Sequence, residues 1–447
     1  MKIAWKSETA LAADDRVTRL QFTCLLAVVL MELAFFVLED RASGVAYLLV
    51  ERYLTLPAMA FLGASFCRPL LRRNKWHLYA GLAMVVLFFL EQFLHQVLES
   101  EAKQVGSFVC AYALCFPFAA ATEDAHRQRG LKWMAGLFLA VGALLTLYAG
   151  LLLFDAVPDY LRSYVTWDGI RFSAMGHPNI CATLLMISLA LSAGLALQSR
   201  KLWIKGALLA LTATQFGAMA LTNGRTTVIL TCLLLGGLTF CVLRGRGWKR
   251  VILALLAAAV VVAALFCLSR AVYGWNQDRL ATQTQSSSAP ATEESQTAVN
   301  GQGTLTDDMK TLNGRTRIWG YALRGLADNP RVKYIGTEYV EMILTRYAPD
   351  TLYHTHNSWL EVLYRMGLPG LAAALFITVL AVWSAAVVLW RNTDLWKSCV
   401  ALLTLCLLGC ALLEPYLFVA DVSYHYLDLL FLMCLGYLCL WRGEKMG

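Results

Sequence analysis

Residues 251–268 read VILALLAAAVVVAALFCL, an apolar run without a charged residue, an amide or a proline. A helix needs about 20 mostly apolar residues to cross the hydrocarbon core of a bilayer, where its backbone groups must be paired within the segment. The whole 447-residue chain shares this character, with 58% hydrophobic and 15% charged residues and a mean hydropathy of +0.56. This composition excludes a soluble multidomain protein and predicts an all-α, polytopic integral membrane protein.

Eleven further apolar runs have a similar length, which predicts about twelve transmembrane helices in all. Lys and Arg favour cytoplasmic loops, and the basic runs of this chain fall on every second connection and at both ends. We therefore expect both termini in the cytoplasm and take the net charge of +8 as a topology signal, with no nucleic-acid partner. The predicted spans are Leu20–Leu38, Val45–Cys67, Leu78–Phe93, Val105–Ala121, Met134–Phe154, Ile180–Leu197, Gly206–Thr222, Thr226–Leu243, Val251–Leu268, Leu368–Trp390, Ser398–Phe418 and Tyr426–Trp441.

One connection is far longer than the others and divides the chain into three parts. Residues 1–268 contain the first nine predicted spans, and residues 368–447 contain the last three. Residues 269–367 between them form the long connection, and the alternation of basic loops places it on the outer side of the membrane.

The long outer connection changes in character along its length. Residues 281–306 are rich in Ser, Thr, Gln and Ala, cannot support a packed core, and are expected to form a flexible insert. Apolar residues at helical spacing return in residues 314–366, which we expect to form the helical, catalytic part of the loop. Short amphipathic helices are expected there at Gly314–Ala327 and Val340–Tyr347.

The segment Tyr353–Gly370, YHTHNSWLEVLYRMGLPG, carries the signals of a further helix. Asn357 or Ser358 is placed to cap its N-terminus. Gly367 is placed to end it, and Pro369 follows at a typical stop position. The helix is therefore expected to lie directly before the tenth span.

This arrangement holds His356 just before a helix N-terminus, whose positive end also favours an anion nearby. Glu361 and Arg365 are spaced to form an ion pair on the polar side of the helix. Histidine side chains exchange protons near neutral pH, so His356 is the candidate general base and His354 has a supporting place. The simpler alternative for His356 is a helix-capping or interface histidine.

Three arginines of the outer face suit a phosphorylated lipid. Arg225 lies in a turn of a few residues between the seventh and eighth spans, Arg315 lies at the start of a short helix, and Arg171 precedes the sixth span. Guanidinium groups stay charged and bind phosphate oxygens in a bidentate manner. Together with a histidine base, they indicate displacement of a lipid diphosphate by an alcohol. For Arg225, the alternative is a charge that snorkels to the membrane interface.

His356-Asn357, followed after nine residues by Gly367-Leu368-Pro369-Gly370, resembles the signature of the O-antigen ligase and O-antigen polymerase superfamily. The resemblance implies a twelve-span frame with a large outer loop before the signature. It also implies that His356 acts on the acceptor hydroxyl and that outer-face arginines bind the diphosphate of an undecaprenyl-linked glycan.

The arginines match the family residue by residue. Arg225 is similar to the family's arginine before the eighth span, and Arg315 to the one that lies four residues before a tryptophan, here Trp319. Arg171, with Pro178-Asn179, is similar to the arginine and Pro-Asn pair at the start of the sixth span. The resemblance implies that these three arginines contact the donor diphosphate.

The resemblance implies a metal-independent membrane glycosyltransferase of the O-antigen ligase type without a cofactor. It would transfer a glycan from undecaprenyl diphosphate to a hydroxyl of an acceptor glycan, glycolipid or glycoprotein, in cell-surface polysaccharide biosynthesis. The site would lie on the outer face of the bacterial cytoplasmic (inner) membrane. Repeat-unit polymerisation and protein glycosylation stay open, as do the acceptor, the glycan composition and the oligomeric state. A secondary transporter is the alternative from another class, and a non-catalytic assembly scaffold is a third.

Further polar residues of the outer face receive minor roles. Arg317, Arg324, Arg331 and Lys333 are expected to form a basic rim that attracts lipid phosphate or an anionic glycan. His177 either ends the loop before the sixth span or takes part in the site. The residues expected to support the site are Asn357, which would orient the motif, and His354, Arg317, Trp319, Gly367 and Gly370.

No metal site is expected. Asp307-Asp308 is a pair of adjacent carboxylates beside the flexible insert, which makes a weak cation site. All thirteen cysteines lie within predicted spans, and no two have CxxC spacing. Asp421, His425 and Asp428, near the last outer connection, are expected to form a polar interface cluster or, alternatively, to line the acceptor path.

Overall fold

The computed structural model describes residues 124–162, 165–168, 170–174, 177–244, 248–286, 314–337, 339–348, 354–391, 394–418 and 425–439. The first four predicted spans and most of the predicted insert at 281–306 lie outside these residues. Contacts within the chain divide it into two compact units. The arginine unit comprises Ala135–Ala322 and Ala385–Glu414, and the histidine unit comprises the described residues of Met1–Met134, Leu323–Ser384 and Pro415–Gly447.

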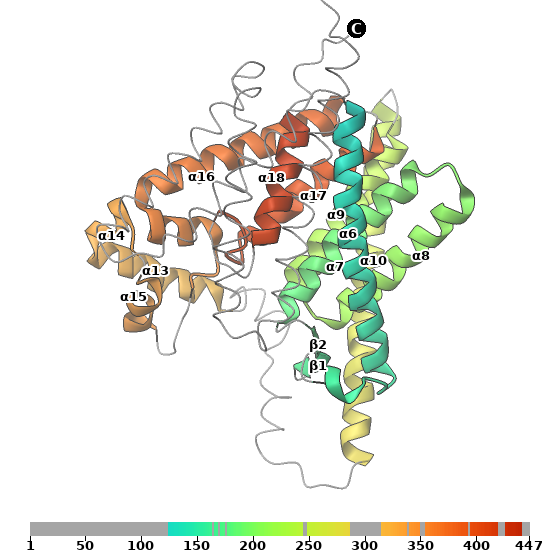
Figure 1. The fold of residues 1–447 in the computed structure, drawn as a ribbon, viewed down its shortest axis with the longest axis horizontal. Coiled ribbons are helices and arrows are strands. Elements are labelled where there is room, and N and C mark those ends of the chain that lie inside the picture. The colour runs from blue at the N-terminus through green and yellow to red at the C-terminus, as the bar shows by residue number, and fades with distance from the viewer. Residues whose placement is uncertain are drawn as a thin grey trace, which may run out of the picture. The chain divides into compact units, whose positions relative to one another are not determined.

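Helices make up most of the described chain (Figure 1). The elements in chain order are α6 (Asp124–Leu153), the 3-10 helix η2 (Asp159–Leu161), β1 (Val165–Asp168), β2 (Arg171–Ala174), α7 (Pro178–Gln198), α8 (Leu202–Leu221), α9 (Arg225–Leu243), α10 (Trp248–Ser286), α13 (Arg315–Asp328), α14 (Pro330–Ile335), α15 (Val340–Tyr347), α16 (Ser358–Arg391), α17 (Leu395–Ala411) and α18 (His425–Cys439).

The described helices make this a multi-pass membrane protein. Six of them are long and apolar enough to cross a bilayer, and they correspond to the fifth to tenth predicted spans. α17 and α18 occupy the places of the last two predicted spans but are shorter, with 17 and 15 residues. The count of twelve stays a prediction. The six segments are Leu131–Leu153, Pro178–Gln198, Leu202–Leu221, Arg225–Leu243, Trp248–Thr282 and Ser358–Arg391.

α10 extends well beyond the end expected for the ninth span. It continues past Leu268 to Ser286, so the first residues of the predicted insert at 281–306 are helical. Arg279 near its end donates a hydrogen bond to the carbonyl of Leu153, the last residue of α6 (Nη1 to O, 2.6 Å). The end of an apolar run predicts where a helix leaves the lipid but does not predict where the helix ends. A helix can continue in water as long as its backbone hydrogen bonds stay paired.

A small β-hairpin departs from the all-α expectation. β1 and β2 pair antiparallel, with Val165 opposite Ala174 and Asp168 opposite Arg171. The sequence held a signal for this hairpin, because Asp168-Gly169 is a typical turn dipeptide between short runs that contain β-branched and aromatic residues.

α7 forms the centre of the arginine unit. Most of its residues are buried, and α8, α9 and α17 pack around it. Gln215 of α8 donates a hydrogen bond to the hydroxyl of Ser188 (2.7 Å), and the hydroxyls of Ser192 and Thr212 lie 2.8 Å apart. Polar side chains in lipid are costly unless paired, so these bonds hold α8 against α7. The N-terminus of α7 is thereby fixed, and this end positions the arginines.

The histidine unit is built on the first part of α16. Tyr364 of this helix is fully buried, and its hydroxyl lies against Gly325 of α13, where even a methyl group would overlap it. Leu344 of α15 is also fully buried. Trp359 and Phe431 flank the ring of Phe418, with centroids 6.0 and 5.7 Å from it. This packing supports the helix that follows His356.

α16 is kinked at Gly367, where the sequence predicted a helix end. Gly367 has φ +66° and ψ −165°, outside the helical region, and a second helical segment continues from there to Arg391. Its α-carbon faces the backbone of Tyr334 and Ile335 at the end of α14. Gly336, with φ +93°, faces the backbone of α16 in the same contact. Only glycine has both the required φ and the required lack of a side chain at these two positions.

We therefore expect Gly367→Ala to destabilise the histidine unit by on the order of 2–3 kcal/mol, because the methyl group would overlap the Tyr334 carbonyl in a left-handed residue. Thermal unfolding of the purified protein in detergent measures this loss. Gly206→Ala in α8 is the matched control, since no heavy atom lies within 4 Å of the place of its added methyl group. Equal unfolding temperatures for the two variants would contradict the assignment.

Candidate functional site

The arginine unit carries candidate residues at the start of α7, where the β-hairpin leads into the helix. Pro178 occupies the first turn of α7, and the Nδ1 atom of His177 accepts a hydrogen bond from the backbone N–H of Asn179 (3.1 Å). His177 is therefore the N-cap of α7, as expected of a residue that ends the loop before the sixth span. β2 begins with Arg171, so the hairpin delivers this guanidinium to the same end of α7.

Arg171 is held in place by two elements of the arginine unit. Its Nε donates to the backbone carbonyl of Thr222 (2.9 Å), in the turn between α8 and α9. Its Nη2 donates to the side-chain oxygen of Asn179 (2.7 Å). The same turn leads to Arg225, which is the first residue of α9. The hairpin, α7 and the α8–α9 turn thus meet around one guanidinium.

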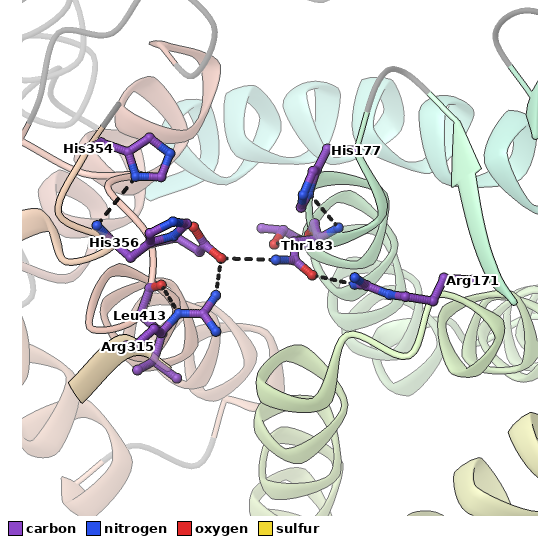
Figure 2. Close-up of polar contacts among 9 residues, drawn as sticks. Arg171, His177, Thr183, Arg315, His354, His356 and Leu413 are labelled. Atoms are coloured by element: carbon purple, nitrogen blue, oxygen red, sulfur yellow. Dashed lines mark hydrogen bonds and ion pairs between the residues drawn. The ribbon is translucent and has the colours of Figure 1, made fainter. Parts of the chain in front are cut away.

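Arg315 is held from the other side of the same network. Its Nε donates to the carbonyl of Leu413 (2.7 Å), and its Nη2 forms an ion pair with the carboxylate of Glu414. The same Glu414 oxygen accepts a hydrogen bond from the side-chain nitrogen of Asn179 (3.0 Å). Figure 2 shows the resulting chain from Arg171 through Asn179 and Glu414 to Arg315. Two of the three predicted arginines are therefore linked by hydrogen bonds.

The charge of Arg225 belongs to the same cluster. The pKa of Arg171 is lowered from its ordinary value, first by burial and then by the positive charges of Arg225 and Arg315, while Asp168 and Tyr273 act in the opposite direction. Repulsion from both of these charges requires that Arg225 and Arg315 each lie within electrostatic reach of Arg171. The structure thus brings together the three arginines that the sequence had singled out, which we name the arginine cluster.

The arginine cluster keeps hydrogen-bond donors available for a ligand. Arg171 and Arg315 each use Nε and Nη2 for the contacts above, and within the described part of the chain Nη1 of each makes no hydrogen bond. Bonds along one edge of a guanidinium fix its plane and leave the remaining N–H groups directed elsewhere. A dianionic group would accept these bonds and relieve the repulsion among the three charges.

The turn that carries Arg225 is unusually tight. Asn223 has φ +51°, and the α-carbon of Gly224 lies so close to Ala182 of α7 that an added methyl group would be 2.7 Å from its side chain. The side-chain oxygen of Asn223 accepts a long hydrogen bond from Arg270 of α10 (3.5 Å). Arg270 also lies over the ring of Tyr273, 5.5 Å from its centroid. Sequence reasoning did not single out Arg270, which lies within α10.

The histidine unit positions His356 as the sequence predicted, just before α16. The side-chain oxygen of Asn357 accepts from the backbone N–H of Leu360 (2.9 Å), which makes Asn357 the cap of this helix. The backbone N–H of His356 donates to Nδ1 of His354 (3.3 Å), and the two rings meet edge to face with centroids 4.1 Å apart (Figure 2). The supporting places expected for Asn357 and His354 fit these contacts.

His356 has a backbone conformation that favours glycine. Its φ is +51°, in the left-handed region, where a residue with a side chain is strained by about 1–3 kcal/mol. Such a residue persists only when its neighbours hold it, and residues of this kind concentrate at active sites. The strain is an independent reason to single out His356, since the sequence motif says nothing about its backbone.

Sequence reasoning did not single out two carboxylates, Glu414 in the arginine unit and Glu361 in the histidine unit. Glu414 binds Arg315, and Glu361 was noted only as the ion-pair partner of Arg365, at 2.8 Å, which the structure confirms. Glu414 fell inside the predicted span Ser398–Phe418, and a carboxylate within such a span is by itself a signal of function. α17 ends at Ala411, so Glu414 lies just beyond its helix.

The other expected site residues have varied surroundings. The indole N–H of Trp319 is buried and has no hydrogen-bond partner among the described residues. Gly367 and Gly370 serve packing: Gly370 lies against the side chains of Met366 and Val362. Asp428 is buried and accepts from the backbone N–H of Phe418 (2.9 Å). The rim residues Arg317, Arg324, Arg331 and Lys333 are exposed.

Some expectations fall outside what the structure describes. Asp421 and Asp307-Asp308 lie outside the described residues, and so does the side chain of His425. Within the described ranges, no three His, Cys, Asp or Glu side chains lie together in a way that could hold a metal ion. The absence of a metal therefore stays a prediction.

The fold and the candidate residues define a class: a multi-pass membrane protein with an arginine cluster in one unit and a strained histidine in the other. Residues 207–375 match the family described as O-antigen ligase, and the resemblance drawn from the sequence motifs is confirmed. The match contains Arg225, Arg315 and His356. A comparison with curated proteins finds no significant match. Members of this superfamily are membrane glycosyltransferase-like enzymes that act on lipid-linked glycans.

Proposed function

We propose that the protein transfers a glycan from undecaprenyl diphosphate to an acceptor hydroxyl on the outer face of the cytoplasmic membrane, during synthesis of a cell-surface polysaccharide. The observation that carries this proposal is the arginine cluster, in which Asn179 and Glu414 orient two guanidiniums within electrostatic reach of a third. The family match supports the class of reaction.

The arginine cluster would hold the leaving group. A diphosphate accepts several charge-assisted hydrogen bonds at once, and guanidiniums supply them in pairs. Arg225 and Arg315 are assigned the main contacts and Arg171 an auxiliary one. Nε and Nη2 of both Arg171 and Arg315 are bound to protein groups, so each of these two arginines would use Nη1 for the diphosphate. Positive charge that is fixed before the reaction stabilises the negative charge that grows on the diphosphate as its bond to the sugar breaks.

His356 would act on the nucleophile. The acceptor oxygen attacks the anomeric carbon, the bond from that carbon to the diphosphate oxygen breaks, and the hydroxyl proton passes to the imidazole. Attack opposite the leaving group inverts the anomeric centre. The cap at Asn357 and the contact with His354 hold the backbone of His356 for this role.

The test is glycan transfer by the purified protein alone in liposomes. The donor is an undecaprenyl-diphosphate-linked glycan, the acceptors are supplied one at a time, and a chelator is present. Release of undecaprenyl diphosphate together with a new glycosidic bond supports the proposal. Movement of the donor across the liposome without bond formation would indicate a transporter, and binding without transfer would indicate a scaffold; either result contradicts it.

The acceptor separates a ligase from a polymerase of repeat units, and a deletion strain gives this readout. A gel of its surface glycan that has lost long chains but retains single attached units indicates a polymerase. Loss of all attached glycan indicates a ligase, which is the activity we propose.

A further inference from the structure

Glu361 is a fully buried carboxylate one turn into α16. Burying a charge is costly unless every oxygen is paired. One oxygen, Oε1, accepts from Nε of Arg365 (2.8 Å). The other, Oε2, accepts from both the backbone N–H and the hydroxyl of Thr355, at 2.9 and 3.0 Å. The two oxygens therefore have separate partners, one on the helix and one on the segment before it.

The partner before the helix is the residue that precedes His356. The Thr355 hydroxyl also lies 3.0 Å from the carbonyl of Asn357, so its single proton is shared between Glu361 and this carbonyl, which follows His356 in the chain. Asn357 is itself fixed as the helix cap. The strained His356 therefore lies between Thr355 and Asn357, and both of these neighbours are hydrogen-bonded to the first two turns of α16.

The contacts of the buried Glu361 carboxylate do more than complete its ion pair with Arg365. An i,i+4 pair on a helix surface stabilises by only a few tenths of a kcal/mol and does not call for a fully buried carboxylate. A carboxylate that accepts two bonds from one residue fixes the direction of the backbone there. The next residue, His356, needs such support because a residue with a side chain disfavours the left-handed backbone conformation.

We propose that Glu361 is a positioning residue, which acts through Thr355 to hold His356 in its left-handed conformation and so aims the imidazole. The inference rests on the proposed role of His356 as the base. It adds a residue whose side chain is not expected to touch the donor or the acceptor.

The experiment compares four variants of the full-length protein in liposomes: Glu361→Gln, Thr355→Val, Thr355→Ser and Arg365→Lys. Glu361→Gln is expected to lower kcat roughly tenfold to a hundredfold, the scale of a misplaced catalytic group, with the KM for the lipid-linked donor unchanged. Thr355→Val is expected to lower kcat in the same direction. Thr355→Ser, which keeps the hydroxyl, and Arg365→Lys, which keeps the charge and the Thr355 contacts, should remain within about threefold of wild type.

A double variant with Glu361→Gln and Thr355→Val should lose little more than Glu361→Gln alone, because the two residues share one interaction. A merely structural role would lower the amount of folded protein but leave kcat per folded molecule unchanged. Should Glu361→Gln fail to fold, the difference between Thr355→Val and Thr355→Ser still decides the question.

Normal kcat in folded Glu361→Gln, or equal kcat in Thr355→Val and Thr355→Ser, would overturn the inference while leaving His356 in place. The variant His356→Ala is measured alongside. Full transfer by His356→Ala would instead overturn the proposed function, and this inference with it.

Discussion

His356→Ala is expected to lose glycan transfer by about 10²–10⁴-fold, the usual contribution of a general base. Without the imidazole, the acceptor hydroxyl must lose its proton to water while it attacks. The arginine cluster is unchanged in this variant, so the KM for the donor should stay within about twofold. The measurement is the initial rate of undecaprenyl diphosphate release by reconstituted protein, and in cells the lipid-linked donor should accumulate.

His354→Ala is the matched control for this prediction. His354 contacts the His356 ring and accepts a hydrogen bond from its backbone, so its loss should lower the rate far less than the loss of His356. If the two variants exchanged places, with His354→Ala inactive and His356→Ala active, the assignment of the base would be wrong. Wild-type transfer by both would remove histidine from the mechanism.

Arg315→Gln is expected to weaken donor binding roughly tenfold to a hundredfold, the value of one charge-assisted hydrogen bond. The Arg315 side chain is 11% exposed and the Glu414 side chain 12%, so this substitution also leaves a nearly buried carboxylate without its ion-pair partner. Arg315→Lys should recover only part of the loss, because lysine keeps the charge but not the planar fork. The KM for the lipid-linked donor measures the effect.

Two comparisons separate ligand binding from structure. Arg317→Gln changes an exposed arginine on the same helix and should raise the KM far less than Arg315→Gln does. Glu414→Gln in the Arg315→Gln background removes the carboxylate that has lost Arg315; we expect it to restore stability but not donor affinity. If donor affinity returned with stability, Arg315 would serve the fold rather than the diphosphate.

Local sequence patterns anticipated the helices near the site well. The segment expected at Val340–Tyr347 is α15 with the same ends, and the helix expected at Gly314–Ala327 is α13, displaced by one residue at each end. The Asn357 cap and the Gly367 break were also anticipated. These features depend on residues within one or two turns of each other, so the order of residue types is enough to predict them.

The same patterns misjudged features where a helix leaves the membrane. α10 continues to Ser286 although its apolar run stops at Leu268, and α17 stops at Ala411 although its predicted span extended to Phe418. Averaged hydropathy predicts which residues lie in the lipid, but it does not predict where the backbone hydrogen bonds of a helix end. For that reason Glu414 was taken as part of a span, and its ion pair with Arg315 was not anticipated.

Composition was sufficient to predict a polytopic membrane protein, since it depends on transfer between water and lipid and requires no knowledge of contacts. The family signature was sufficient to single out His356, Arg225, Arg315 and Arg171. The hydrogen-bond partners of these residues were determined only by the tertiary structure. Asn179 and Glu414 are 235 positions apart in the chain, and no local periodicity relates them. The packing of α7 among α8, α9 and α17 fixes the start of α7, where Asn179 binds Glu414. The left-handed backbone of His356 likewise follows from its hydrogen-bonded neighbours and not from its own preference.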